Sequence, residues 1–420
     1  MIKRVLPVFI LFLLCLPFEA RAEEVLTWQN CVREAAKNHP DLISSIEGIN
    51  QEKAAKAVTA SGLYPQITGT AGVSTAKTSS SSGSDDYSYG ASASQLVFDG
   101  FKTANEVKSA SENIQAAKES YRFTSSQVRL NLRTAFINLL KAQELIQVTE
   151  DITKIRRDNL VLITLRYESG LEHKGALLKA EADVAQASFE ASQAKRDVEL
   201  SQRQLTKEMG RKEFKPMYVK ADFTVSDSAK EKPSFEEIVK TNPSVLQTVA
   251  KKNSAAYGIK SAYANFAPEV SGAAGASKSS ASWPPENEQW NLGLSLNLPI
   301  FEGGLRFAQV NQAKAAYNQA VANERSTKDT AIVSLEQTWV SLQDAIETVV
   351  VQLKTLEAAQ ERSKIAEAQY SVGFITFDNW IIIEDELVRA KINYLNAQAN
   401  AVLAEANWIQ AKGETLEYAQ

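Results

Sequence analysis

The residue types that most often carry out chemistry are scarce in this chain. Its 420 residues include two histidines and two cysteines, which is little material for a zinc site or a thiol–imidazole pair. His39 and His173 each stand without a second predicted ligand, so we expect neither to bind a metal. The sequence has no nucleophile–base pattern and no phosphate-binding loop motif. We therefore expect no enzymatic activity, no metal and no cofactor.

The composition favours long helices over a large α/β enzyme. Glycine and proline number 18 and 11, while 44% of the residues are hydrophobic and 23% are charged. An enzyme of this size with many tight turns would need more glycine and proline. The formal net charge is −4, whereas nucleic-acid-binding proteins normally present a basic face, so we expect no nucleic acid partner.

Residues 1–22 have the pattern of a secretory signal peptide. Basic residues precede a short apolar run, and the segment ends at Ala22 with the small residues that a signal peptidase reads. The run is too short to cross a bilayer comfortably as a helix. Leu14 precedes Cys15, where a lipoprotein would have a small residue; this disfavours a lipid anchor without settling the question. Cleavage would leave Cys31 as the single cysteine, so we expect no internal disulfide.

The chain contains an internal duplication at a constant offset of 203 residues, for example 242 minus 39. Five landmarks share this offset, so no net insertion separates the two copies between them. A period this long indicates a duplicated structural unit and not a short solenoid repeat. The landmarks are His39-Pro40 with Asn242-Pro243, Tyr64-Pro65 with Ala267-Pro268, Phe98-Asp99-Gly100 with Phe301-Glu302-Gly303, Tyr167 and Gly170 with Tyr370 and Gly373, and Gly210 with Gly413.

The duplication divides the chain into a signal peptide, a first structural repeat, an irregular linker, a second structural repeat and a C-terminal tail. Each repeat is predicted to hold a helix, a β-hairpin, a very long helix and a return helix. After the signal peptide the segments are residues 23–210, 211–233, 234–413 and 414–420. The first helices are predicted at 28–63 and 235–266, the hairpins at 66–98 and 269–300, and the long helices at 101–168 and 305–370, with return helices that end at 209 and 412.

The long helices carry a coiled-coil pattern, in which apolar residues recur at spacings of three and four. At a rise of 1.5 Å per residue, a helix of ~68 residues is roughly 100 Å long, which exceeds an ordinary globular domain. The sequence therefore predicts an elongated, mainly α-helical body with a small β part. The seam of the second copy is Ile332, Leu335, Trp339, Leu342, Ile346, Val349, Leu353 and Leu356.

The predicted hairpins alternate between apolar and small or polar residues, most clearly over 290–300. Such strands suit an outer membrane, where about 9–11 tilted residues with one apolar face are needed, but two ordinary hairpins capping a helical bundle would alternate in the same way. Four strands cannot close a barrel, and open sheet edges cannot lie in lipid. On the membrane interpretation, each subunit adds four strands to a shared barrel. The polar loops are 77–86 and 278–289, and the flanking aromatic residues are Tyr64, Phe98, Phe101, Phe266 and Phe301.

These features together resemble the outer membrane efflux family typified by TolC, over most of the chain beyond the signal peptide. The resemblance implies a homotrimer with a 12-stranded β-barrel in outer-membrane lipid and an α-barrel in the periplasm. It also implies a passive exit duct of a tripartite efflux pump or type I secretion system. The implied partners are a periplasmic adaptor (membrane fusion) protein and an inner-membrane transporter of the RND or ABC type.

The resemblance also assigns candidate sites. The turns marked by Tyr167, Gly170, Tyr370 and Gly373 would contact the adaptor, although the glycines would serve equally as helix stops. The pore constriction would lie just after the second turn, where the best-studied relatives carry acidic residues and an arginine; here Ile375 stands at the arginine position. The candidates for the constriction are Asp378, Asn379, Ile382 and Glu384, and the alternative for the acidic run 384–386 is a solvated helix start.

A periplasmic coiled-coil adaptor or scaffold protein is the alternative function. It would share the helical hairpins, but it would lack two matched strand pairs and an end-to-end duplication. Neither function identifies the cargo, because a tunnel lumen is generic and selection would lie mostly in the transporter and adaptor.

Overall fold

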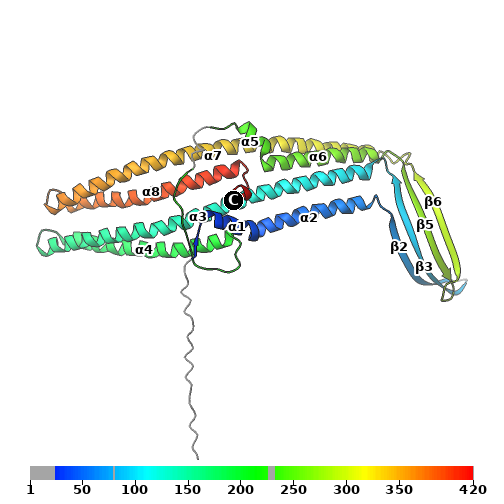
Figure 1. Cartoon of the computed structure of the whole chain (residues 1–420), viewed down its shortest axis with the longest axis horizontal. Helices are drawn as coiled ribbons and strands as arrows, with labels where there is room; N and C mark the ends of the chain where they lie inside the picture. Colours follow the sequence, from blue (N-terminus) through cyan, green and yellow to red (C-terminus); the bar gives the residue numbers. More distant parts are fainter. Residues whose placement is uncertain (1–23, 79–80, 226–231, 420) are drawn as a thin grey trace, which may run out of the picture.

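The computed structural model describes residues 24–78, 81–225 and 232–419. They form an elongated body of long helices with one small sheet at an end (Figure 1). The predicted signal peptide lies outside the described residues. Within the described part of the chain, every helix is too short or too polar to cross a membrane.

The duplication is visible as three pairs of helices with equal lengths. The members of each pair contain 22, 67 and 35 residues and begin 203 residues apart, as in 243 minus 40. The body is therefore two copies of one unit, and the long helices of both copies extend through its whole length. The pairs are α2 (Pro40–Ser61) with α6 (Pro243–Ala264), α3 (Lys102–Glu168) with α7 (Leu305–Ser371), and α4 (Lys174–Glu208) with α8 (Phe377–Ala411).

The first helix predicted in each copy is in fact two helices. A short helix, α1 (Trp28–Asn38) or α5 (Phe235–Thr241), precedes α2 or α6. The break falls at His39 and Asn242, whose backbones are extended with ψ angles of 124° and 126°. A proline follows each of these residues and disfavours the helical conformation before it. The same proline begins the next helix well, because its missing N–H needs no partner there.

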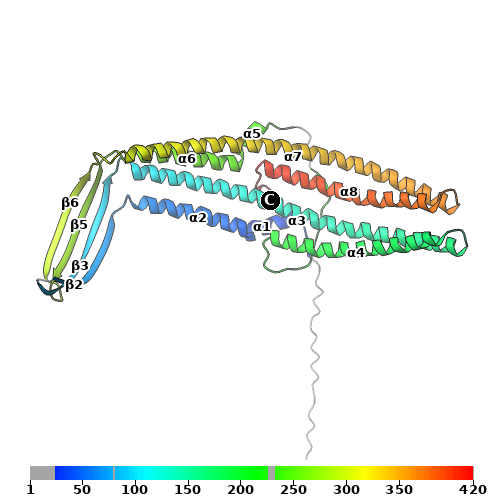
Figure 2. The ribbon, with the colours of Figure 1, turned by 180° about the vertical axis from the view of Figure 1, so that it is seen from behind.

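The return helices end against the beginnings of α2 and α6. Gly210 and Gly413 follow α4 and α8 with positive φ angles of 71° and 79°. A Cβ atom on Gly210 would lie 2.4 Å from the Asn38 carbonyl oxygen, and one on Gly413 would lie 2.4 Å from Cδ of Pro243. Consequently α4 and α2 follow one another along the body, as α8 and α6 do (Figure 2).

The sheet joins the two repeats through antiparallel pairing in the order β2-β3-β5-β6. The polar segment predicted as a loop at 77–86 is mostly strand. β3 begins at Ser81, and Thr75 donates a hydrogen bond of 2.7 Å across the hairpin to Asp85. The first hairpin therefore extends beyond the second. The strands are β2 (Gln66–Thr78), β3 (Ser81–Phe98), β5 (Glu269–Ser280) and β6 (Asn287–Asn297).

A second, smaller sheet lies at the middle of the body, where β1 (Glu24–Leu26) pairs in parallel with β4 (Met217–Val219). The segment 211–233, predicted to be irregular, thus contributes a strand. Gln143 fixes it by donating to the Val219 carbonyl and accepting from the Val219 N–H, both at 2.9 Å. Arg211 adds paired hydrogen bonds of 2.6–2.9 Å to Glu24 and Glu34. These contacts attach the start of the described chain to the end of the first repeat.

The C-terminal segment is packed and ordered by side chains of α3. It forms a short 3₁₀ helix, η2 (Leu416–Ala419), whose Leu416 is fully buried. The Glu417 carboxylate accepts hydrogen bonds from Tyr121 at 2.7 Å and Ser125 at 2.9 Å. Burial and this carboxylate raise the pKa of Tyr121 to about 12. The tail therefore links the second repeat to the long helix of the first.

Candidate functional site

The helical tip furthest from the large sheet is held by a stack of three side chains. The Tyr370 ring lies 4.4 Å from the Trp380 ring at an interplanar angle of 13°, and the Arg166 guanidinium lies 4.7 Å from the Tyr370 centroid. Arg166 belongs to α3, whereas Tyr370 and Trp380 belong to α7 and α8. The stack therefore joins the tip of the first repeat to that of the second.

Glu172 completes this arrangement from the turn between α3 and α4. The Tyr370 hydroxyl donates a hydrogen bond of 2.8 Å to Glu172, and Arg166 donates one of 3.3 Å to the Tyr370 carbonyl. Burial, followed by the hydrogen bond to Glu172, raises the pKa of Tyr370 well above its ordinary value. Tyr370 thus remains a protonated donor at physiological pH. We refer to Arg166, Glu172, Tyr370 and Trp380 as the tip cluster.

The acidic run 384–386 does not form a solvated helix start. Helix α8 begins at Phe377, and each acidic residue of the run is bonded to another helix. Asp385 pairs with Arg156 of α3, and Glu386 accepts a hydrogen bond of 2.5 Å from Arg362 of α7. The Arg156–Asp385 pair is a second connection between the repeats.

Glu384 lies away from the open surface of the protomer. Its side chain accepts a hydrogen bond of 2.5 Å from Ser363 in the seam between α7 and α8, and the residue is 3% exposed. The position follows from helix geometry, because two residues along an α-helix correspond to about 200° of rotation. If Ile382 faces outward, Glu384 must face the opposite side. In the protomer, Glu384 is therefore buried between α7 and α8.

The other three candidates for the constriction share an exposed strip of α8. Asp378 and Asn379 are exposed, and Ile382 is 53% exposed. The Asn379 backbone N–H also donates to the Thr376 hydroxyl, which caps the helix. Ile375, at the position of the relatives' arginine, instead packs against the apolar core of the tip. Of these three residues only Asp378 is charged, and it lies in the first turn of α8.

The two tip turns expose apolar side chains next to their glycines. Gly170 and Gly373 have positive φ angles of 72° and 84°, with open space where a Cβ would lie. The residues that follow them, Leu171 and Phe374, are 67% and 83% exposed. Of the tyrosines predicted there, Tyr167 is 38% exposed, whereas Tyr370 is buried at 1%. The turn glycines and their apolar neighbours thus form the accessible surface.

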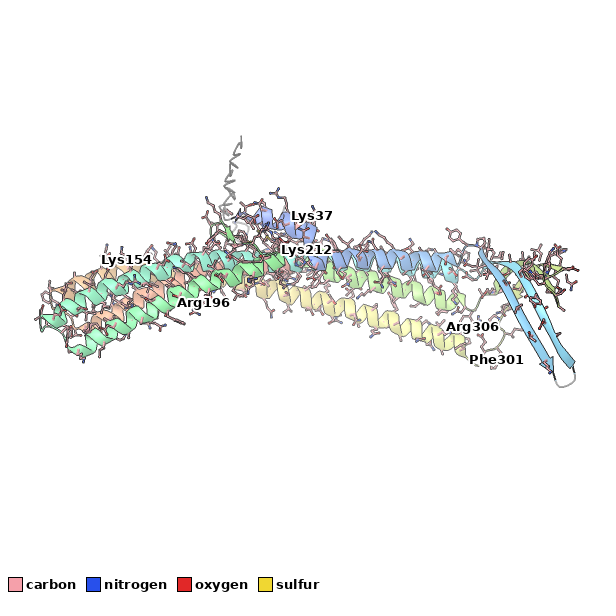
Figure 3. The ribbon with its side chains drawn as sticks, turned by 90° about the horizontal axis from the view of Figure 1, so that it is seen from below. Lys37, Lys154, Arg196, Lys212, Phe301 and Arg306 are labelled. Atoms are coloured by element: carbon pink, nitrogen blue, oxygen red, sulfur yellow. The ribbon has the colours of Figure 1, made fainter. Side chains whose placement is uncertain are left out.

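At the other end of the body, the large sheet has one apolar and one small polar face. The strand register places the large apolar side chains on one side and hydroxyl and amide groups on the other. Phe301 and Arg306 lie where the helical body meets this sheet (Figure 3). The apolar face carries Ile67, Ala71, Val73, Tyr89, Val270, Trp290, Leu292, Leu294 and Leu296, and the polar face carries Thr68, Thr70, Ser88, Ser92, Ser271, Ser277, Asn291 and Ser295.

The sequence patterns did not reveal Arg156, Arg166, Glu172 and Trp380. Arg156, Arg166 and Glu172 each contact a residue more than 190 positions away, as in 370 minus 172 for the Glu172–Tyr370 bond. Trp380 stacks on Tyr370, which makes two of these contacts. The duplication was the available signal, since it predicts that both tips lie at the same end of the body.

The arrangement defines an elongated, duplicated helical protein that carries a four-stranded sheet at one end and a bonded helical tip at the other. The sequence profile of the outer membrane efflux protein family matches residues 31–211 and 235–414. The chain therefore belongs to this family, whose members are outer-membrane channels and not enzymes, and it resides in the outer membrane and extends into the periplasm.

Individual relatives are similar to this chain over most of its length. Outer membrane efflux protein BepC of Brucella suis biovar 1 (strain 1330) is 23% identical over 398 residues, covering 94% of this chain and 86% of the relative. Outer membrane protein TolC of Escherichia coli (strain K12) is 24% identical over 315 residues, with coverage of 70% and 63%. The crystal structure of the outer membrane protein VceC from Vibrio cholerae has a TM-score of 0.79 at 18% identity, with coverage of 92% and 96%.

Proposed function

We propose that three copies of this chain form the outer-membrane exit duct of a tripartite efflux pump. The observation that carries this proposal is the four-stranded sheet with two open edges, one apolar face and one polar face, attached to a duplicated helical body. A type I secretion system would use a duct of the same design. The duct is passive, because the transporter supplies the energy and the duct supplies a path.

The apolar face supports a position of the sheet across the membrane. On β6, the apolar side chains from Trp290 to Leu296 are each at least 67% exposed in the protomer. A strand of ~11 residues tilted by about 45° covers roughly 25 Å, the height of the apolar band on outer-membrane barrels. Burial of these side chains in lipid would remove them from water, and the hydroxyl-rich face would line an aqueous lumen.

The open edges support the trimer. β2 and β6 are the outer strands of the sheet, and they run antiparallel to one another, so β6 of one copy can pair with β2 of the next in the pattern of the existing sheet. Three copies would then contribute twelve strands to one closed barrel. Closure would satisfy the backbone groups that an open edge leaves unpaired, which lipid requires.

The tip supports docking to a periplasmic adaptor and an inner-membrane transporter. Leu171 and Phe374 expose apolar surface beside the two turn glycines, where an adaptor's helical hairpin could bury it. Among the relatives, one from Pseudomonas putida is named as part of an antibiotic efflux pump and one from Escherichia coli O157:H7 as part of a cation efflux system. The cargo therefore varies among relatives of similar identity to this chain.

The tip cluster is our candidate for the element that holds the duct closed. It joins the repeats, and buried nitrogen atoms of Arg166 and Trp380, and of Arg156 nearby, have no hydrogen-bond partner among the described residues. Such atoms cost about 1–3 kcal/mol each when water is excluded, which lowers the barrier to rearrangement. Asp378, Asn379 and Ile382 would face the constriction, where three copies of Asp378 would favour cations.

The test is the detergent-corrected mass of protein extracted from outer membranes, followed by conductance in planar bilayers. Three chains per particle and a measurable pore are expected. A particle of one chain that stays in solution without detergent would refute the duct and favour the periplasmic scaffold or adaptor. Carbonate washing gives an independent check, since a duct remains with the membrane pellet and a scaffold is released.

A further inference from the structure

The two histidines of this chain occupy the same kind of position, at the start of a helix in the first repeat. His39 precedes α2 and His173 precedes α4, and the Nδ1 atom of each accepts a hydrogen bond from a backbone N–H of the first helical turn. The donors are Asp41 at 3.2 Å and Ala176 at 3.1 Å. Each bond satisfies an N–H group that has no partner within its own helix.

Both caps require a neutral imidazole. A neutral ring has one donor and one acceptor nitrogen, whereas an imidazolium has two donors and no acceptor. Because Nδ1 accepts in both cases, the hydrogen bonds assign the single ring proton to Nε2. Histidine is the side chain that ordinarily changes its charge between about pH 5 and 8. A second proton on either ring therefore removes the cap.

The surroundings of His39 provide partners for the charged ring. The residue is 5% exposed, and its Nε2 atom lies 3.6 Å from the Glu208 carboxylate at the end of α4. The Asp41 carboxylate of α2 lies 4.0 Å from Nδ1, the atom that would carry the second proton. Lys207 of α4 is bonded to the same Glu208 at 2.8 Å. The two carboxylates favour the charged imidazole, which burial alone would disfavour.

His173 has a corresponding set of contacts at the tip. Its Nε2 atom lies 3.7 Å from the Glu172 carboxylate, which also accepts the hydrogen bond from Tyr370 of α7. The nearest cation of this group is Arg166 of α3, whose guanidinium lies over the Tyr370 ring. The imidazole folds back over Gly175, where a Cβ would come within 3.0 Å of Nδ1. A charged His173 would thus act on the carboxylate that joins this turn to the second repeat.

The second repeat caps the equivalent helices without a titratable group. The positions 203 residues further on, as in 242 minus 39, are Asn242 and Thr376. Their side-chain oxygens accept hydrogen bonds from the Ser244 and Asn379 N–H groups. An amide and a hydroxyl keep the same acceptors when a histidine changes its charge. The fold therefore accepts a permanent cap at both positions, and the histidines make the caps of the first repeat sensitive to protons.

We propose that His39 and His173 form a proton-sensitive switch in the first repeat. In the neutral state each ring caps its helix. In the protonated state each ring pairs with its neighbouring carboxylate and releases the first turn of α2 or α4. The helix dipole also disfavours a positive charge at a helix N-terminus, so the charged ring is displaced from the capping position. Acid thereby loosens the junction of α4 with α2 and the first tip turn, while α6 and α8 keep their caps. The proposal does not depend on the duct function.

The test is backbone hydrogen exchange of the purified, detergent-solubilised protein at pH ~5 and pH ~8, the range over which histidine titrates. Mass spectrometry follows peptides from the starts of α2, α4, α6 and α8, and protection factors remove the intrinsic pH dependence of amide exchange. Protection at the starts of α2 and α4 should fall about fivefold in acid, which corresponds to the loss of a typical cap. The starts of α6 and α8 are the internal controls, and their protection should not change.

Two variants transfer the caps of the second repeat into the first. His39→Asn should abolish the acid response at α2 and keep it at α4, whereas His173→Thr should do the opposite, so each variant is the control for the other. If His39→Asn fails to fold, His173→Thr still carries the test, because the His173 side chain is 68% exposed. A response of equal size at all four helices, no response in the wild type, or a response that persists at the helix with the replaced cap would overturn the proposal.

Discussion

At the scale of single residues, both histidines serve the backbone. The Nδ1 atoms of His39 and His173 accept hydrogen bonds from backbone N–H groups at the starts of α2 and α4, at 3.2 and 3.1 Å. Asn242 and Thr376, their equivalents in the second repeat, do the same with side-chain oxygens. A side chain with catalytic potential is here a helix cap that asparagine or threonine can replace.

His39 therefore offers a direct test of capping through the variants His39→Asn and His39→Ala. Both variants lose the contact of His39 Nε2 with the Glu208 carboxylate at 3.6 Å. The free energy of unfolding should nevertheless fall by about 1 kcal/mol less in His39→Asn than in His39→Ala, because only the amide can replace the cap. Asn242 accepts a hydrogen bond from the Ser244 N–H and donates one to the Ala411 carbonyl. An amide introduced at position 39 can make the equivalent bonds to the Asp41 N–H and the Glu208 carbonyl. Urea unfolding followed by circular dichroism measures the difference. Equal losses in both variants would contradict a capping role.

Tyr370 provides the residue-scale test of the tip cluster. Tyr370→Phe removes the hydroxyl that donates to Glu172 and leaves a carboxylate with a 10% exposed side chain without this donor. The connection between the tips should weaken by about 1–3 kcal/mol. Single-channel conductance in planar bilayers should rise relative to the wild type. Tyr167→Phe is the control, because Tyr167 lies outside the stack; a similar rise there would argue against the cluster.

Cys31 is expected to be inert as a thiol. The residue is fully buried, and burial, with a smaller effect of Glu34, raises its pKa to about 12. The protonated thiol contributes to stability below pH ~9, and this contribution is lost as the pH rises toward 12. Iodoacetamide at pH 8 should modify Cys31 only after unfolding. A Lys37→Cys variant, made at an exposed position of the same helix, should react at once and serves as the control.

At the scale of elements, the helix junctions depend on glycine more than the tip turns do. Gly210 and Gly170 have nearly equal φ angles, 71° and 72°, but only at Gly210 would an added Cβ meet backbone atoms, three of them within 2.8 Å. Gly170→Ala should therefore cost about 1 kcal/mol from the left-handed backbone alone. Gly210→Ala should cost clearly more and lower the thermal midpoint further. Equal midpoints would show that the junction tolerates separation of α4 from α2.

The sequence predicted the helices better than the strands, for reasons that lie in particular elements. Constant spacing of proline and glycine located α3, α4, α7 and α8 within a few residues. The strand β3 was underestimated because its first residues are Ser, Gly and Asp, which favour loops locally; pairing with β2 overrides that tendency. The strands β1 and β4 have three residues each, too few for a periodic pattern.

The candidate site was predictable in part. The resemblance to the family supplied Asp378 and Ile382 as candidates, and both are exposed in the protomer. It could not assign Glu384 to a seam, because the Ser363 that bonds it is on another helix. The tip cluster depends on contacts between the repeats. Residues so far apart in a single sequence leave no pattern that identifies them as neighbours.

At the scale of the whole molecule, the two faces of the sheet predict opposite responses to charge. Leu294 is on the apolar face and is 79% exposed in the protomer, whereas Ser295 is on the polar face and shares a hydrogen bond of 2.8 Å with Ser271. Leu294→Lys should destabilise the inserted barrel by about 2–4 kcal/mol, the cost of a cation facing lipid near the midplane. In the proposed duct Ser295→Lys should be tolerated, because its side chain would face the aqueous lumen.

The measurement is the amount of folded oligomer in outer-membrane fractions, detected by electrophoresis without heating. Loss of the oligomer in the Leu294 variant alone would support the assignment of the faces. Loss in the Ser295 variant alone would reverse the assignment, and the serines of the hairpins would then face lipid.

The helix junctions also have a mechanical consequence. At the level where α4 meets α2 and α8 meets α6, only α3 and α7 continue without interruption. Among the described residues, each protomer therefore crosses this level on two continuous helices and two helix junctions, and the packed segments β1, β4 and η2 brace those junctions. The far tip lies roughly 50 Å from this level, along half of a 67-residue helix. A sideways force on the tip therefore produces a bending moment at this level that grows with that distance. Because the duplication sets both junctions at the same height, α3 and α7 carry a bending load across that level together.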